Sequence, residues 1–259
     1  MSRFLHKFAS LIHGIASLIR WIASLIIQIG SAELIRGTLF AGVTVSEISV
    51  WHVTKEKNTS IRLKDRSSLD AIARQLPEGY YSTFRTFAGG TRVLGLTSHL
   101  RRLYEPVPKA DVDESLLRRQ LSHVLEAYRS NEARVRAIIT RQGQVYLAIA
   151  PLMPFPRAIY EEGVRVETTE LFRDHPHLKS TAFIGRSDAE RKHIAEAGIF
   201  EALLVKRGKI LEGMTSNFFY ILQQDGLPPH LLTARAGILP GVTRETVIAI
   251  ARGRKLQVK

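Results

Sequence analysis

The chain of 259 residues contains no cysteine. A disulfide framework, a cysteine nucleophile and a cysteine-ligated metal site are therefore excluded. The absence of cysteine also fits a reducing compartment, and we expect a cytoplasmic protein. His175 and His177 share one loop, but no further metal ligands stand at useful spacing, so the sequence predicts no metal site.

A block of like charge is also missing, although the formal net charge is +13. A net positive charge of this size can favour binding to nucleic acid, to an anionic membrane surface or to acidic ligands. The lysines and arginines are spread along the chain with no run of five like charges. No nucleic-acid-binding motif accompanies them, so we interpret the charge as solvated faces and expect no nucleic-acid partner.

The hydrophobic content is 45% and the charged content 24%, which is ordinary for a globular protein. Residues 8–29 differ from the rest, because Ala-Ser-Leu-Ile occurs there three times with a period of seven. This pattern predicts an amphipathic helix, and we assign residues 1–36 to a helical extension. Arg20 disfavours a membrane span. Peripheral membrane binding or self-association fits the heptads best; a secretory signal and an added segment without packing partners remain alternatives.

The middle of the chain shows alternating strand patterns and short helical patterns. Residues 80–87 turn at Gly89-Gly90 into a second strand, which predicts a hairpin. Thr97 or Ser98 is expected to cap a helix that begins near His99. Further strands are predicted at 42–51, 91–96, 134–140 and 144–150, and further helices at 68–75 and 112–129.

The proline-dense run 151–156 is typical of an interdomain linker. It divides the chain into a smaller N-terminal domain, 37–153, and a C-terminal domain, 154–259. In the second domain the pattern predicts strands at 163–168, 201–211 and 218–222, a helix at 188–197 and a final helix that opens at Gly241.

The second domain carries three chemical groups that belong together. Lys179 is a candidate amine nucleophile, since lysine forms Schiff bases when its ammonium is desolvated or lies near other cations. Glu212 lies between two strand patterns, where a carboxylate can face a pocket. The helix start at Gly241 offers free N–H groups to an anion. An amine, a carboxylate and a phosphate cradle are what a pyridoxal phosphate enzyme needs.

The motifs around these residues follow one another in the order of a known family. They resemble the C-terminal half of class IV aminotransferases, the fold-type IV pyridoxal phosphate enzymes, which include branched-chain and D-amino acid aminotransferases and aminodeoxychorismate lyase. The motifs that carry the resemblance are Leu178-Lys179-Ser180, Glu201-Ala202-Leu203-Leu204, Gly208 to Gly213, Ser216-Asn217-Phe218-Phe219 and Gly237 to Arg244.

The resemblance implies an α+β fold of two domains, with pyridoxal 5′-phosphate between them, and a homodimer that acts on an amino acid and a 2-oxo acid. Lys179 would form the Schiff base and move the proton. His99-Leu100-Arg101-Arg102-Leu103 resembles a phosphate-binding element, in which Arg102 would be the ligand. The other implied cofactor-binding residues are Glu212, Ser216, Asn217, Leu239, Gly241, Val242 and Thr243. The implied substrate-binding residues are Arg136, Tyr81 and Arg85.

Some positions depart from the family pattern. Ser82 stands where the branched-chain and D-amino acid enzymes have a glutamate, and Ile184 stands where the branched-chain enzymes have a tyrosine. The family also continues beyond the equivalent of Val258 with further strands, so we expect an incomplete C-terminal domain. A lyase that uses the same cofactor, and a homologue without turnover, are therefore the alternatives to the aminotransferase.

Overall fold

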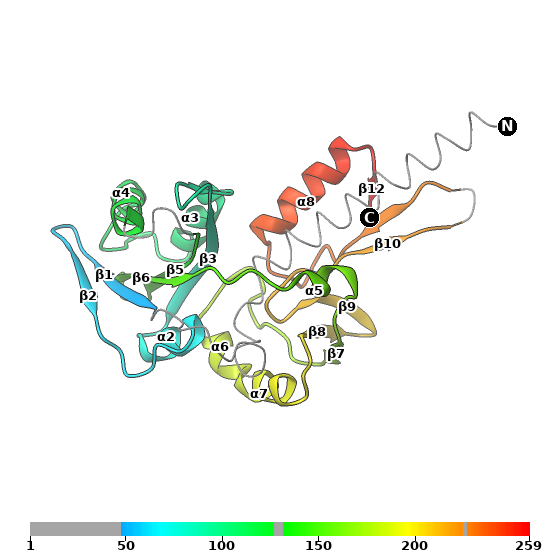
Figure 1. Ribbon diagram of the computed structural model, residues 1–259, viewed down its shortest axis with the longest axis horizontal. Coiled ribbons are helices and arrows are strands. Elements are labelled where there is room, and N and C mark those ends of the chain that lie inside the picture. The colour runs from blue at the N-terminus through cyan, green and yellow to red at the C-terminus, as the bar shows by residue number, and fades with distance from the viewer. Residues whose placement is uncertain (1–47, 127–131, 225–226) are drawn as a thin grey trace.

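The computed structural model describes residues 48–126, 132–224 and 227–259. The predicted helix over residues 8–29, and with it the extension 1–36, lies outside the described residues. Within those ranges the chain forms an N-terminal part up to residue 151 and a C-terminal part from residue 157 (Figure 1). No helix in the described ranges is both long enough and apolar enough to cross a bilayer.

The N-terminal part is built on one six-stranded sheet with the order β2-β1-β6-β5-β3-β4. All neighbouring strands in it are antiparallel. Every residue of β5 is buried, because helices cover both faces of the sheet. The strands are β1 (Ser49–Val53), β2 (Asn58–Ile61), β3 (Gly79–Phe87), β4 (Arg92–Val93), β5 (Ala133–Thr140) and β6 (Val145–Pro151).

Successive residues of the central strands enter different cores, as the two-residue period of a strand requires. Val135 and Ala137 of β5 pack with α3 (Leu96–Tyr104) and α4 (Glu114–Leu125). On the opposite face, Ile138 packs with Tyr81 and with Ile184 of the C-terminal part. The helix α2 (Leu69–Gln75), which Ser68 caps with its side chain, covers this second face.

The C-terminal part contains two three-stranded sheets. In the first, β7 (Val166–Thr169) runs parallel to β8 (Glu201–Lys206), and β8 pairs with β9 (Lys209–Gly213) in the antiparallel sense. The helices α6 (Ala182–Arg186) and α7 (Asp188–Glu196) contribute Phe183 and Ile194 to its core. The short helix α5 (Arg157–Glu161) precedes this sheet.

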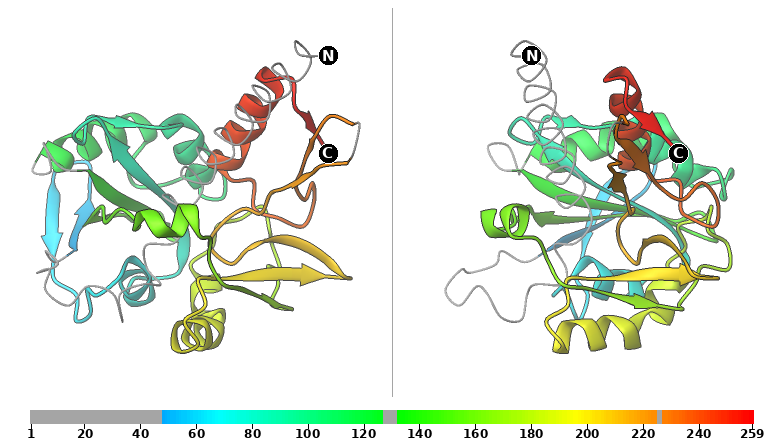
Figure 2. Two further views of the ribbon diagram at one scale, coloured as in Figure 1. Left: turned by 45° about the vertical axis from the view of Figure 1, so that its right-hand side comes forward. Right: turned by 90° about the vertical axis from the view of Figure 1, so that its right-hand side faces the viewer.

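The second small sheet consists of β10 (Tyr220–Leu222), β11 (His230–Leu232) and β12 (Gln257–Val258). The helix α8 (Val242–Gly253) packs Val247 and Ala251 against it. Figure 2 shows α8 on the side of the C-terminal part opposite to α7. The N-terminus of α8 thereby points at the junction of the two parts, where the pocket described below lies.

A short backbone pairing joins the two parts next to Lys179. The N–H of Tyr81 donates to the carbonyl of Lys179 at 2.9 Å, and the N–H of Thr181 donates to the carbonyl of Gly79 at 2.9 Å. Gly79 allows this close packing, since a Cβ there would lie 2.1 Å from the carbonyl oxygen of Ile139. The lysine is therefore attached to the edge of the N-terminal sheet.

Most of the predicted elements are confirmed, and a few differ for local reasons. The strands predicted at 80–87, 134–140 and 144–150 and the helices at 68–75 and 188–197 match β3, β5, β6, α2 and α7 within two residues. The helix α3 begins earlier than predicted, at Leu96, after Gly95 in the left-handed region. This early start shortens β4 to two residues. The domain boundary near residue 153 stays a prediction.

Candidate active site

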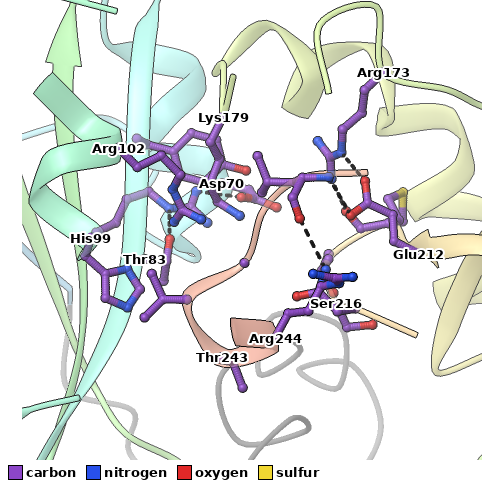
Figure 3. A pocket seen from close by; sticks show the side chains of 18 of the residues that line it. Asp70, Thr83, His99, Arg102, Arg173, Lys179, Glu212, Ser216, Thr243 and Arg244 are labelled. Atoms are coloured by element: carbon purple, nitrogen blue, oxygen red, sulfur yellow. Dashed lines mark hydrogen bonds and ion pairs between the residues drawn. The ribbon is translucent and has the colours of Figure 1, made fainter. Parts of the chain in front are cut away.

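The pocket between the two parts is lined by all the residues predicted for the site except Arg85. Figure 3 shows Arg173 and Glu212 on one side of it, His99 and Arg102 on the opposite side, and Thr243 at the start of α8. The predicted residues that line it are Tyr81, Arg102, Arg136, Lys179, Glu212, Ser216, Asn217, Leu239, Gly241, Val242 and Thr243. Arg85 instead forms an ion pair with Glu132 and stacks on Phe87.

Lys179 extends its ammonium into this pocket over the ring of Tyr81, at 4.9 Å from the ring centroid. The residue keeps some solvent contact, but protein atoms crowd around the ammonium from both parts. Burial and the nearby guanidinium groups of Arg102, Arg173 and Arg136 hold the pKa of Lys179 well below its ordinary value, while Glu212 opposes them. A lowered pKa favours the neutral amine, which is the form in which a lysine acts as a nucleophile and a base.

Glu212 is buried in β9, and both of its oxygens have partners. Oε1 accepts from Nε of Arg173 at 2.9 Å, and Oε2 accepts from the N–H of Leu239 at 3.1 Å. The pKa of Glu212 is raised on balance, because burial outweighs the opposing effect of the adjacent Arg173. Arg173 is fixed in turn, because its guanidinium lies 3.8 Å from the ring centroid of Phe183 and donates to the carbonyl of Met214. The pair holds a carboxylate in the pocket wall.

Arg102 connects three segments on the opposite wall. It donates to the carbonyl of Pro240 at 3.1 Å and to the hydroxyl of Ser82 at 3.0 Å. The Ser82 hydroxyl lies 2.9 Å from Nδ1 of His99, and burial lowers the pKa of His99 to about 3. Because arginine only donates and His99 is neutral, Ser82 gives its own proton to Nδ1. Burial lowers the pKa of Arg102 to about 10, so it stays cationic at neutral pH.

The first turn of α8 faces Arg102 and carries no side-chain cap. Its N–H groups are therefore open to an anion, and the helix dipole favours negative charge there. Gly241 is needed for close packing, since a Cβ at this position would lie 2.2 Å from Oδ1 of Asn217. Asn217 fixes the preceding loop by donating to the carbonyl of Leu239 at 3.4 Å.

Comparison with known proteins identifies the family to which this chain belongs. The family model described as amino-transferase class IV matches residues 79–259. The chain belongs to the class IV aminotransferases. A protein of Thermotoga maritima assigned as a branched-chain-amino-acid aminotransferase is 28% identical over 212 residues, which cover 76% of this chain and 73% of the relative.

Solved structures of class IV aminotransferases and their relatives share the fold. A structure from Thermotoga maritima assigned as a branched-chain amino acid aminotransferase has a TM-score of 0.63 at 24% identity, covering 82% of this chain and 76% of that one. A protein assigned as a 4-amino-4-deoxychorismate lyase has a TM-score of 0.58 at 26% identity, covering 76% and 82%. The predicted α+β architecture of fold-type IV is thus confirmed, and the chain is an aminotransferase of this class.

Class IV aminotransferases depend on pyridoxal phosphate, and the residues of this pocket fit that group. The amine of Lys179, whose pKa is held well below its ordinary value, suits the aldehyde of this group, and the carboxylate of Glu212 suits a protonated pyridine nitrogen. Arg102 and the start of α8 line the pocket together, so an anion between them could accept hydrogen bonds from both. Nε of Arg102 is buried without a hydrogen-bond partner among the described residues, which fits a ligand bound there.

Several residues of this class IV site were not predicted from the sequence. Arg173 orients Glu212, as described above. Glu201 is buried under the loop that carries Ser216, and its Oε2 accepts from Thr215 and from the Ser216 hydroxyl at 3.0 Å. No periodicity marks Arg173, which stands in a loop, and Glu201 is one residue of a strand motif with no role assigned to it from the sequence. A carboxylate that opens a buried strand is the one signal that could have identified Glu201.

The wall that contains Arg136 also holds two residues without a predicted role. Nη1 of Arg136 lies 2.6 Å from Oδ1 of Asp70, and Nε of Arg136 donates to Thr83 at 3.0 Å. The other oxygen of Asp70 lies 2.7 Å from Nη1 of Arg191. Arg136 also lies 4.5 Å from the ring centroid of Tyr81, the ring that Lys179 contacts.

Proposed function

We propose that this aminotransferase moves an amino group between an α-amino acid and a 2-oxo acid, with Lys179 as the catalytic residue. The observation that supports the assignment best is the environment of Lys179. Its ammonium is surrounded by three guanidinium groups and one carboxylate, and its pKa is strongly lowered. A structural lysine has no need of this environment, whereas an amine that reacts at neutral pH requires it.

When bound, pyridoxal phosphate supplies an aldehyde for amines and a ring that accepts electrons from the substrate α-carbon. Lys179 would hold the cofactor through its amine. Its Nζ, once free, would accept a proton from the substrate α-carbon and give it back on the other side. The lowered pKa favours the neutral form of Nζ that can accept this proton.

The remaining residues would hold the cofactor in a fixed orientation. Arg102 and the N–H groups of Val242 and Thr243 would bind the phosphate from two sides. Glu212, which is paired with Arg173, would hold the proton on the pyridine nitrogen. Ser216 and Asn217 would support the phosphate end through the loop that Glu201 fixes, and Leu239 would pack on the ring.

Arg136 is the substrate-binding residue that we favour, together with Tyr81. Both side chains lie in the pocket, and the ring of Tyr81 contacts both Arg136 and the amine of Lys179. A substrate whose α-carbon lies near Lys179 could therefore place its carboxylate on Arg136. Arg85 is a weaker candidate because it pairs with Glu132 away from this pocket.

A lyase is the second candidate function. The solved structure assigned as a 4-amino-4-deoxychorismate lyase covers most of this chain at 26% identity, and this likeness favours testing it. The two reactions use the same lysine and differ in their products. Amine transfer to 2-oxoglutarate identifies the aminotransferase, whereas release of pyruvate without an amine acceptor identifies the lyase.

We also propose that the enzyme acts as a cytoplasmic homodimer with the N-terminal domain at 37–153 and the C-terminal domain at 154–259. The dimer rests on the family resemblance, the boundary on the proline-dense run 151–156, and the compartment on the lack of cysteine. Light scattering of the purified protein tests the dimer, and limited proteolysis between residues 151 and 156 tests the boundary.

The activity is tested by screening amino donors with 2-oxoglutarate and added pyridoxal phosphate. The Lys179→Ala variant should lose transfer entirely. Lys192→Ala is the matched control, because the Lys192 side chain is 77% exposed and lies on α7 outside the pocket. Equal turnover by wild type and Lys179→Ala would rule out the proposed role of this lysine.

A further inference from the structure

A buried carboxylate in the pocket wall is shared by two arginines that come from different parts of the chain. Asp70 of α2 has a side chain only 7% exposed, and its two oxygens contact Arg136 of β5 and Arg191 of α7 separately. The two distances are 2.6 Å and 2.7 Å. Arg191 is anchored further by donating from Nε to the Ser187 hydroxyl at 3.0 Å. Buried charges at such distances are held in a defined geometry.

The charges of this group decide how strongly Arg136 attracts an anion. Asp70 alone would neutralise Arg136, because one carboxylate balances one guanidinium. With Arg191 on the second oxygen, the group of two arginines and one aspartate keeps one net positive charge. Asp70, Arg136 and Arg191 line the same pocket as Lys179 (Figure 3), so this charge lies in the pocket where the reaction is proposed to occur.

We propose that Arg191 is a positioning residue that acts through Asp70 to keep Arg136 available for the carboxylate of the substrate. The inference rests on the proposed function, in which Arg136 receives that carboxylate. Arg191 draws one oxygen of Asp70 towards the C-terminal part and balances its charge. Arg136 is then aligned by Asp70 and Thr83 without being neutralised by them.

A second ion pair between the same two helices provides a control. Arg74 of α2 lies 2.8 Å from Asp188 of α7, but these side chains are 40% and 47% exposed. Neither Arg74 nor Asp188 lines the pocket. If Arg191 served only to attach α7 to α2, the loss of either pair would have a similar effect on the enzyme.

The test compares wild type with Arg191→Met, Arg191→Lys and Arg74→Met, each loaded with pyridoxal phosphate. We expect Arg191→Met to raise KM for the amino donor and for 2-oxoglutarate roughly tenfold, which corresponds to ~1.4 kcal/mol. Its kcat and its visible cofactor spectrum should change little. Arg191→Lys should recover most of the affinity, since it restores the charge without the bond to Ser187. Arg74→Met should behave like wild type.

Calorimetric titration of 2-oxoglutarate gives an independent readout that needs no turnover. Its Kd should rise in Arg191→Met by the same factor as KM. Unchanged KM and Kd in Arg191→Met, or an equal change in Arg74→Met, would overturn the inference and leave the proposed function intact. A wild-type protein that neither takes up pyridoxal phosphate nor transfers amines would refute the proposed function, and the titration would still test Arg191.

Discussion

His99 should make the protein sensitive to acid, and the size of the effect follows from its surroundings. The side chain is 5% exposed, and burial together with Arg102 and Lys179 lowers its pKa from 6.5 to about 3. The unfolded chain takes up this proton below pH 6.5, whereas the folded protein does so only near pH 3. Between pH 6.5 and about pH 3, acid therefore stabilises the unfolded state relative to the folded one. The resulting loss of unfolding free energy is complete below about pH 3.

The magnitude is worked from the shift of the pKa. One pKa unit corresponds to ~1.4 kcal/mol, so the whole shift would cost about 5 kcal/mol, and the part between pH 6.5 and 4.5 about 3 kcal/mol. Protonation would also remove the acceptor for the Ser82 hydroxyl and so release Arg102. We expect the fold and the phosphate site to weaken together in acid.

Urea unfolding at pH 7 and pH 4.5 measures this contribution. His99→Asn keeps an acceptor for Ser82 but has no proton to take up, so its loss of unfolding free energy between the two pH values should be about 3 kcal/mol smaller than in wild type. His123→Asn is the matched control, because the His123 side chain is 74% exposed. The carboxylates contribute equally to all three proteins. Equal losses in wild type and His99→Asn would refute the reasoning.

Three further substitutions test the packing that supports the site. Gly79→Ala should cost at least 1–3 kcal/mol of unfolding free energy, because its Cβ would lie 2.1 Å from a backbone oxygen of β5. Gly185→Ala is the control, because a Cβ there has no neighbour within 4 Å. Equal stability of the two variants would contradict this reasoning. Arg173→Met should leave Glu212 without its ion-pair partner, at a cost of about 3–5 kcal/mol of unfolding free energy. It should also weaken the binding of pyridoxal phosphate, measured by fluorescence titration. An unchanged Kd for pyridoxal phosphate would contradict a role of this pair in the site. Glu201→Ala should lower the thermal midpoint by removing the acceptor of four hydrogen bonds, while the exposed Glu196→Ala should not; the same midpoint for both would exclude a supporting role.

Lys179 and the other motif residues of the candidate site could be predicted because their signals are short and local. Lys179, Glu212 and the start of α8 at Gly241 each stand in a motif of a few residues, and the fold brings them into one pocket. Periodicity was sufficient for β3 and β5, where alternate residues enter different cores. Local sequence therefore predicts most elements and most of the pocket lining.

The charged residues that orient the site could not be predicted in this way. Arg173, Asp70 and Arg191 stand in a loop and two helices, where a charged side chain is usually solvated. Their partners are 39, 66 and 121 residues away in the chain, so only tertiary packing brings them together. Sequence periodicity carries no information about such pairs.

The start of α3 shows the same limit for secondary structure. A polar cap at Thr97 or Ser98 is the expected local signal, but the helix begins after Gly95, with φ 64°. A Cβ on Gly95 would lie 2.5 Å from Cγ1 of Val242 in α8. The glycine is required by a contact with the other part of the molecule, and tertiary packing has overridden the local preference for a polar cap.

The central claim is that Lys179 binds pyridoxal phosphate in this pocket. The most direct measurement is the visible absorption spectrum of the purified protein with added pyridoxal phosphate, followed by borohydride reduction and mass mapping of the labelled peptide. We predict a visible band in wild type, its absence in Lys179→Ala, and a covalent label on Lys179 alone. No band in wild type, or a label spread over exposed lysines such as Lys192, would contradict the account.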